Sequence, residues 1–211
     1  MKRNITPVQY LLIGYIVAIV GGGVLLSLPF FSKGIGLVDA LFTSTSAICV
    51  TGLIVRDTAV EFTLPGKILI LLLIQLGGLG YMSVVTTVIY LLTRRTPLGT
   101  LLMAKEDMGE NTLSRISGFA VKVIKFTLLI ESLGFLILWW GFSKEGLPLG
   151  SAVFHALFHS VSAFCNAGFS SFSTNLGDWG GNPVIVLTVA SLVIIGGWGF
   201  VVTVELLNKR K

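Results

Sequence analysis

Two short segments of this 211-residue chain are built alike around one glycine and could present main-chain oxygens to a cation. They read Cys49-Val50-Thr51-Gly52 and Cys165-Asn166-Ala167-Gly168. Glycine reaches backbone conformations that other residues avoid, so a glycine at the same place in both segments lets carbonyl groups point at a common axis. Rings of carbonyls can replace the hydration shell of a monovalent cation. We expect both segments to line a cation filter; the alternative is that Gly52 and Gly168 only turn the chain.

The two segments belong to an internal repeat. Ala40-Leu41-Phe42 recurs 116 positions later as Ala156-Leu157-Phe158, in register with the two glycine segments. A second block, Gly77-Gly78-Leu79-Gly80-Tyr81, recurs 119 positions later as Gly196-Gly197-Trp198-Gly199-Phe200. Two matched blocks in the same order indicate a duplicated structural unit. Parallel repeats in a membrane are related by an axis along the membrane normal, which is where a pore would lie.

The composition indicates a membrane protein in which helices position these segments. Hydrophobic residues make up 54% of the chain and charged residues 12%, with a mean hydropathy of +0.90. Three uncharged intervals are longer than the roughly 20 residues that cross a bilayer: they lie between Arg3 and Lys33, between Lys67 and Arg94, and between Asp178 and Glu205. We expect a fourth span at Phe119–Phe142. Two cysteines are too few for a disulfide scaffold or a four-thiolate zinc site.

The basic residues predict the orientation of these spans. The net charge of the chain, +5, does not indicate nucleic-acid binding, because the basic residues flank the apolar runs instead of forming a patch. With the N-terminus inside, eleven of the fifteen fall on the inner face: Lys2, Arg3, Arg94, Arg95, Lys105, Arg115, Lys122, Lys125, Lys209, Arg210 and Lys211. Only Lys33, Arg56, Lys67 and Lys144 fall outside. The positive-inside rule therefore predicts that both termini are cytoplasmic in the plasma membrane.

The segment Ala40–Val55 is uncharged but too short to cross comfortably. We expect a re-entrant loop, a short helix followed by extended backbone that returns to the same side. Non-helical backbone at membrane depth is tolerated where protein encloses it or where it lines a water-filled cavity. The predicted fold is all-α and integral to the membrane, with tandem helix, pore-loop, helix units around a pore axis: 1–95 and 118–211, joined by a cytoplasmic linker at 96–117.

The sequence resembles the bacterial Trk and Ktr potassium-uptake proteins, most closely the Ktr-type membrane subunit. The resemblance covers nearly the whole chain and is strongest in Ala40–Thr58, Ile74–Thr86 and Phe154–Phe169. It implies potassium uptake through a filter with a single glycine per unit, with potassium as the substrate at Cys49–Gly52 and Cys165–Gly168. It implies no covalently bound cofactor and leaves sodium coupling open.

The family has four such units where this chain has two. The expected partner is therefore a missing second half or a second copy of the chain. Two other interpretations stay open: a two-pore-loop potassium channel acting as a homodimer, and a truncated membrane subunit that does not transport. The resemblance also implies a cytoplasmic regulatory ring that binds nucleotides, and the linker is the largest inner surface available to it. The units that carry the gating residues of the family have no counterpart in this chain, so gating residues cannot be assigned here.

Other motifs carry structural interpretations. The glycine-rich blocks, which include Gly77, Gly78, Gly80, Gly196, Gly197 and Gly199, lie inside expected spans, so they allow close helix packing or a gating hinge. His155 and His159 are four apart, as zinc ligands can be, but no acid or cysteine completes the set, which favours helix packing or hydrogen bonding. Glu131 should face protein or water. Nothing here indicates an enzyme, because Gly168-Phe169-Ser170-Ser171 lacks the second glycine of a nucleophile elbow.

Overall fold

The computed structural model describes residues 7–93 and 111–198, with side chains described for 12–80 and 123–198. The regular secondary structure of these residues is helical, apart from one isolated antiparallel bridge between Ser32 and Phe62. The predicted all-helical fold is confirmed for this part of the chain. The helices follow in the order α1 (Pro7–Ser27), α2 (Leu37–Ile48), α3 (Thr58–Glu61), α4 (Leu64–Thr93), α6 (Asn111–Lys144), α7 (Leu149–Phe164), the 3-10 turn η1 (Gly177–Trp179) and α8 (Pro183–Gly197).

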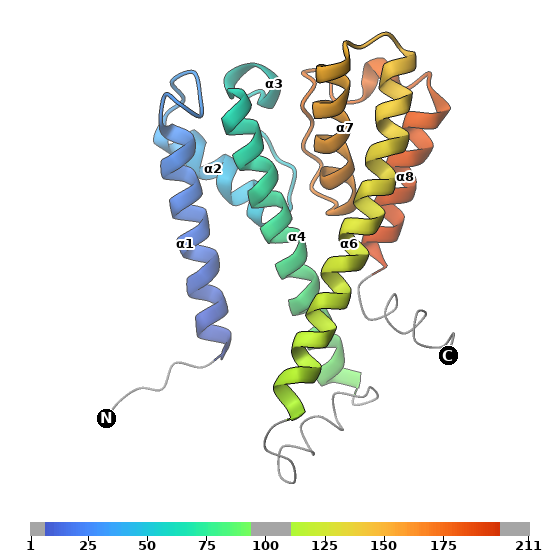
Figure 1. Ribbon diagram of the computed structural model, residues 1–211. Helices are drawn as coiled ribbons and strands as arrows, with labels where there is room; N and C mark the ends of the chain where they lie inside the picture. The colour runs from blue at the N-terminus through green and yellow to red at the C-terminus, as the bar shows by residue number, and fades with distance from the viewer. Residues whose placement is uncertain (1–6, 94–110, 199–211) are drawn as a thin grey trace.

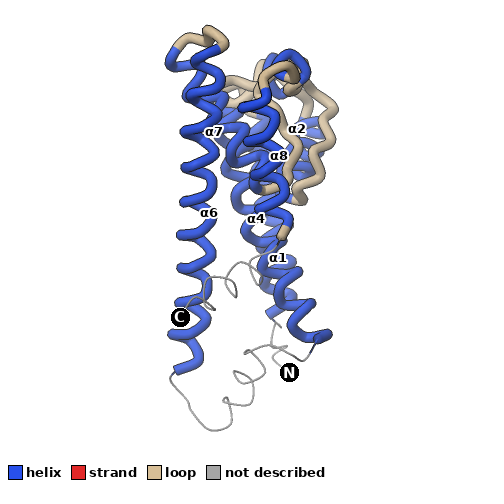
Figure 2. The backbone as a smooth tube through the Cα atoms, turned by 90° about the vertical axis from the view of Figure 1, so that its right-hand side faces the viewer, coloured by secondary structure: helices blue, strands red, loops and turns tan. Residues whose placement is uncertain are grey.

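The helices group into two units with the same order of elements. In each, one short helix packs against two others: α2, of 12 residues, against α1 and α4, and α7, of 16 residues, against α6 and α8. Figure 1 shows α1 to α4 on one side and α6 to α8 on the other, with α2 and α7 in the upper half of their units. After each short helix, non-helical backbone returns toward the end from which that helix entered (Figures 1 and 2).

One hydrogen bond fixes the short helix in each unit. The Ser44 hydroxyl of α2 donates to the Ile19 carbonyl of α1, at 2.8 Å. The Ser160 hydroxyl of α7 donates to the Glu131 carbonyl of α6, at 2.6 Å. Ser44 and Ser160 are 116 positions apart, so the duplication extends from the sequence to the tertiary contacts.

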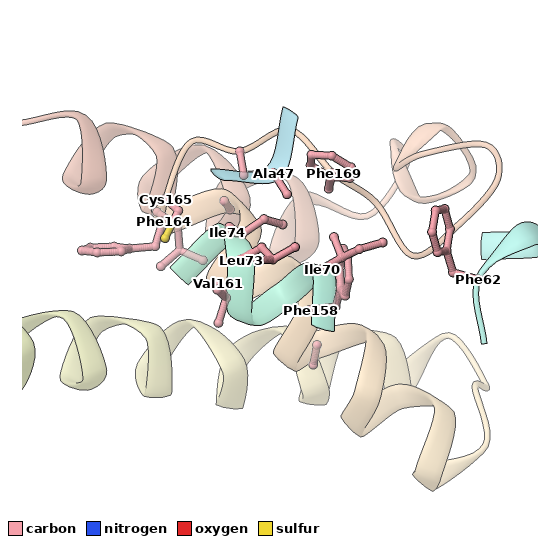
Figure 3. Close-up of a cluster of buried hydrophobic side chains, with 14 of the residues drawn as sticks. Ala47, Phe62, Ile70, Leu73, Ile74, Phe158, Val161, Phe164, Cys165 and Phe169 are labelled. Atoms are coloured by element: carbon pink, nitrogen blue, oxygen red, sulfur yellow. The ribbon is translucent and has the colours of Figure 1, made fainter. Parts of the chain in front are cut away.

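Part of the buried core lies where the two units meet. Figure 3 shows apolar side chains from both converging, including Ile70, Leu73 and Ile74 of α4 and Phe158 and Val161 of α7. All five are buried, and α4 packs on α7 across the boundary between the units. Burying an apolar side chain of this size stabilises a fold by about 1.5–3 kcal/mol in water, and this contact brings the two glycine segments together.

The outward faces of the long helices are apolar. Val17 of α1, Leu76 of α4, Leu133 of α6 and Leu187 of α8 are each about half exposed or more. Among the described side chains, one helical stretch, Val123–Lys144, is long and apolar enough on its own to cross a membrane. The full helices α1, α4 and α6 contain 21, 30 and 34 residues, and at 1.5 Å per residue each exceeds about 30 Å.

Helix α6 begins at Asn111, inside the segment predicted as a linker. The preceding residues 96–110 of that segment lie outside the described residues, as do the N-terminal and C-terminal basic residues used to predict orientation.

Candidate functional site

Helices α2 and α7 end in the same hydrogen-bonded turn. In the first, the Val50 and Thr51 amides donate to the Ala47 and Ser46 carbonyls, at 3.3 and 3.0 Å. In the second, the Asn166 and Ala167 amides donate to the Ala163 and Ser162 carbonyls, at 3.0 and 2.8 Å. This is the Schellman arrangement that satisfies the last carbonyls of a helix.

These bonds determine where the next carbonyls point. All peptide bonds of the described residues are trans, and in a planar trans peptide the C=O of one residue points opposite to the N–H of the next. Because the Val50 and Thr51 amides point back at α2, the Cys49 and Val50 carbonyls point away from it. The same reasoning directs the Cys165 and Asn166 carbonyls away from α7.

Positive φ angles repeat at matched positions. Val50 and Gly52 have φ of 55° and 72°, and Asn166 and Gly168 have φ of 60° and 71°. The residue between each pair has a negative φ. The sign of φ thus alternates in the same order along both segments. The predicted need for a glycine is met at Gly52 and Gly168, whereas Val50 is a β-branched residue that rarely adopts this conformation.

The two glycines lie next to each other. A Cβ on Gly52 would be 2.6 Å from the Ala167 carbonyl oxygen and 3.2 Å from the Gly168 Cα. The structure thus brings together two segments separated by more than a hundred residues. The C-terminal ends of α2 and α7, which carry partial negative charge, both lead into this place. Main-chain oxygens and two helix ends make the surroundings favourable for a cation.

The two loops differ in exposure. Cys49 is exposed whereas Cys165 is buried. After the glycines, Leu53 and Ile54 are 63% and 56% exposed, whereas Phe169 and Ser170 are 2% and 9% exposed. The first loop therefore lies at an open edge of the described structure, and the second is enclosed.

The glycine-rich blocks are packing contacts in the described residues. Gly77 lies against the main-chain carbonyl of Ile48, the last residue of α2, and Gly196 lies against that of Phe164, the last residue of α7. Gly78 lies against Cys165, and Gly80 lies against the Tyr15 hydroxyl. Gly197 has only the Asn166 amide nitrogen nearby, at 3.9 Å from an added Cβ, and Gly199 lies outside the described residues. Since α4 continues through its glycines without a break, these contacts favour close packing over a hinge in α4.

Sequence reasoning missed the contacts that hold the segments after the glycines. Asp39 of α2 accepts a hydrogen bond from the Arg56 guanidinium, at 2.6 Å. This contact raises the pKa of Arg56 above its usual value. At the matching positions of the second unit, the rings of His155 and Phe172 stack with centroids 4.0 Å apart. The repeat offset of 116 relates both pairs, which is the signal that could have found them.

The histidines take part in hydrogen bonds rather than a metal cluster. His155 Nδ1 lies 2.7 Å from the Ser171 hydroxyl, and His159 Nε2 lies 3.0 Å from the Ser170 hydroxyl. The described residues contain no group of three or more His, Cys, Asp or Glu side chains placed to hold a metal ion. These bonds agree with the packing and hydrogen-bonding interpretation of the His155/His159 spacing.

In the part of the chain that the structure describes, the helical fold, the apolar outer faces and the duplicated unit are typical of a membrane transport protein. Comparison with known proteins agrees, because the family model TrkH, described as a cation transport protein, matches residues 10–211. The chain belongs to this family of cation transport proteins, as a Trk/Ktr-type membrane subunit, and the family consists of transporters and not enzymes.

Several relatives are similar over nearly all of this chain. The Ktr system potassium uptake protein B of Vibrio alginolyticus is 41% identical over 195 residues, 92% of this chain and 43% of that protein. The protein of the same name from Bacillus subtilis (strain 168) is 38% identical over 98% of this chain and 46% of its own length. The potassium/sodium uptake protein NtpJ of Enterococcus hirae is 33% identical over 100% of this chain and 47% of its own length. The chain spans less than half the length of these relatives.

Proposed function

We propose that this chain supplies two units of a four-unit pore for potassium uptake across the plasma membrane. The carbonyls of Cys49–Gly52 and Cys165–Gly168 would line its filter, with potassium as the substrate. The observation that carries the proposal is the adjacency of Gly52 and Gly168 at the ends of two helices with matching Schellman turns. The names of the relatives, which are potassium uptake proteins, support the choice of ion.

The open edge supports the need for further units. Cys165, at the start of the second loop, lies against Gly78 of α4 in the first unit, whereas the corresponding Cys49 of the first loop is exposed among the described residues. A carbonyl-lined filter works when protein surrounds the ion, because each carbonyl replaces part of the hydration shell. Two units of the same kind, contributed by a second half or by a second copy, would complete the enclosure.

Potassium uptake at limiting external potassium tests this function. The chain is produced in potassium-uptake-deficient cells, either alone or with two further units joined to or expressed beside it. We expect growth and uptake only when four units are present, and loss of both in Gly52→Ser. Uptake by the chain alone would indicate a homodimer. No uptake in any combination would leave a non-transporting subunit and contradict the proposal.

The relative NtpJ is named for sodium as well as potassium. Sodium dependence of potassium uptake is therefore the accompanying measurement. Coupling is present if uptake at fixed potassium rises with external sodium, and absent if sodium only competes.

The proposed orientation places both termini and residues 96–110 in the cytoplasm. The positive-inside distribution of basic residues supports it. Lys33 and Lys144 are exposed at the opposite end of the described helices. In intact cells, an impermeant thiol reagent should label Lys33→Cys and Lys144→Cys above the background of the parent chain. Labelling of Lys105→Cys from outside would contradict this orientation.

A cytoplasmic nucleotide-binding ring is the proposed regulatory partner. The "Ktr system" names of the relatives imply an assembly of several components. Deleting residues 105–110 tests the contact without shortening α6, which begins at Asn111. Copurification with a cognate ring should be lost in this deletion. Copurification that survives the deletion would exclude the linker as the main contact.

A further inference from the structure

One face of α7 is hydrogen-bonded to the chain that returns after the second glycine segment. His155, His159 and Ser162 are four and three residues apart, which places them on one side of the helix. His155 Nδ1 contacts the Ser171 hydroxyl at 2.7 Å, and His159 Nε2 contacts the Ser170 hydroxyl at 3.0 Å. The Ser162 hydroxyl donates to the Phe169 carbonyl at 2.7 Å. Three successive residues of the returning chain, Phe169 to Ser171, are thus bound by three residues on one side of the helix. We call these three contacts the α7 clamp.

The hydrogen bonds of the clamp have a defined direction at its centre. His159 Nδ1 lies 2.7 Å from the His155 carbonyl oxygen, and a carbonyl can only accept. The neutral ring therefore carries its proton on Nδ1, and Nε2 accepts from the Ser170 hydroxyl. The Ser170 oxygen in turn accepts from the Phe172 amide, at 3.0 Å. His159, Ser162 and Ser171 are each at most 3% exposed, so water does not compete for these bonds.

Among its described residues, the first unit has no equivalent of this clamp. Thr43, at the position of His159, donates to the Asp39 carbonyl of its own helix, and Ser46, at the position of Ser162, interacts with the Thr51 hydroxyl. Ile54 and Val55 occupy the positions of Ser170 and Ser171 and are 56% and 48% exposed. The returning chain of this unit is tied to α2 by the exposed Asp39–Arg56 pair. A pair this exposed contributes little stability.

The clamp is placed where it can control the second filter loop. Phe169 follows Gly168 directly, and its carbonyl is bound by Ser162, so it points to α7 and not to the pore axis. The preceding carbonyls of Cys165 and Asn166 point away from the same helix. The loop is therefore anchored at both ends, by the Schellman turn before it and by the clamp after it. A loop held in this way resists contracting around a smaller ion.

We propose that the α7 clamp makes the second loop the rigid half of the filter, and that His159 and Ser170 are positioning residues that set the preference for potassium over sodium. This rests on the proposed function. Binding geometry is kept within a fraction of an ångström when the groups behind it are themselves locked by hydrogen bonds. The exposed first loop would be the adaptable half.

Hydrogen–deuterium exchange of the purified chain in detergent tests the rigidity, whether or not it transports. His159→Thr installs the residue of the first unit and keeps a hydroxyl for the i−4 carbonyl. We expect amide exchange in residues 167–172 to rise about fivefold, as for the loss of one hydrogen bond, with residues 51–56 unchanged. Thr188→Val is the matched control, because its hydroxyl bonds only to the Val184 carbonyl of its own helix. Unchanged exchange in both His159→Thr and Ser170→Ala would overturn the clamp.

Ion competition tests the selectivity in the four-unit combination that transports. His159→Thr and Ser170→Ala should each lower the potassium-to-sodium preference several-fold while uptake of potassium alone continues, and Thr188→Val should change neither. A variant that only misfolds would lower uptake of both ions in proportion. Uptake with an unchanged preference in both variants would overturn the positioning role and leave the proposed function standing. If the unsubstituted chain shows no uptake in any combination, the proposed function and the selectivity role both fail.

Discussion

Gly78 of α4 lies so close to Cys165, at the end of α7, that a Cβ on the glycine would come within 2.5 Å of the cysteine sulfur. This contact joins the first unit to the second. Its two members recur in the repeat as Gly197 and Cys49, and neither has so close a neighbour among the described residues: a Cβ on Gly197 would meet only the Asn166 amide nitrogen, at 3.9 Å, and Cys49 is exposed. Each outer edge of the pair of units thus carries one half of the same contact.

Gly78→Ala should destabilise the contact between the units. The added methyl would meet both the sulfur and the Cβ of Cys165, the latter at 2.8 Å, and overpacking of this kind costs about 1–3 kcal/mol. Cys165→Gly in the same chain leaves the Cys165 Cα at 3.5 Å as the nearest atom, so the double variant should recover part of the loss. The thermal midpoint in detergent measures both effects. Gly21→Ala, with nothing within 4 Å, is the control and should not destabilise.

Cys49 and Cys165 should react differently with thiol reagents. Cys49 is exposed and Cys165 is 8% exposed, so the purified chain should be modified first at Cys49. If further units complete the ring, a glycine of a neighbouring unit covers Cys49, and its modification should slow. Mass spectrometry of the labelled peptides follows both sites. Equal modification of Cys49 with and without the added units would contradict this closure of the edge.

The two filter glycines should differ in sensitivity. Both have positive φ, so a side chain costs roughly 1–2 kcal/mol at either position. A Cβ on Gly52 would also meet the Ala167 carbonyl oxygen at 2.6 Å, whereas one on Gly168 meets only the Gly52 Cα, at 3.4 Å. Gly52→Ala should therefore lower the yield of folded protein and potassium uptake more than Gly168→Ala. The reverse order would show that the two loops do not approach each other in this way.

Exchanging Val50 and Asn166, which lie two positions before the glycines, should change stability in opposite directions. Val50 and Asn166 both have left-handed backbone, which asparagine tolerates and a β-branched residue does not. Val50→Asn should raise the thermal midpoint by the equivalent of about 1 kcal/mol, and Asn166→Val should lower it. Val50→Ile keeps the β-branch and serves as the control. A lower midpoint in Val50→Asn would show that the valine side chain stabilises the loop by other contacts.

Glu131 should tolerate an amide better than an apolar side chain. It is 6% exposed on α6 and lies beside Gln75 of α4, while its Oε1 has no hydrogen-bond partner in the structure. Glu131→Gln keeps a polar partner for Gln75, whereas Glu131→Leu leaves that amide unpaired, at a cost of about 1–3 kcal/mol. Thermal unfolding in detergent compares the two variants. An equal loss in both would show that the carboxylate itself is required.

The sequence by itself determined the class of protein, the duplication and the places where the backbone turns. Spans follow from the absence of charge over lengths that match a bilayer, and the repeat follows from residue identity at fixed offsets. Gly52 and Gly168 could be found because a positive φ selects glycine, and the structure places both there. The placement of Glu131 away from lipid also follows from the sequence, because an acidic side chain inside a membrane needs protein or water around it.

Only the tertiary structure decided which segments meet and how the two units differ. Nothing local in the sequence tells that Gly78 rests on Cys165, because close packing depends on how α4 and α7 are placed. The α7 clamp was hidden for the same reason: two histidines on a helix say nothing about the serines that return beside it. Repeats are recognised from the residues they share, whereas their asymmetry depends on tertiary neighbours: Cys165 of the second loop lies against Gly78 of the first unit, and Cys49 of the first loop is exposed.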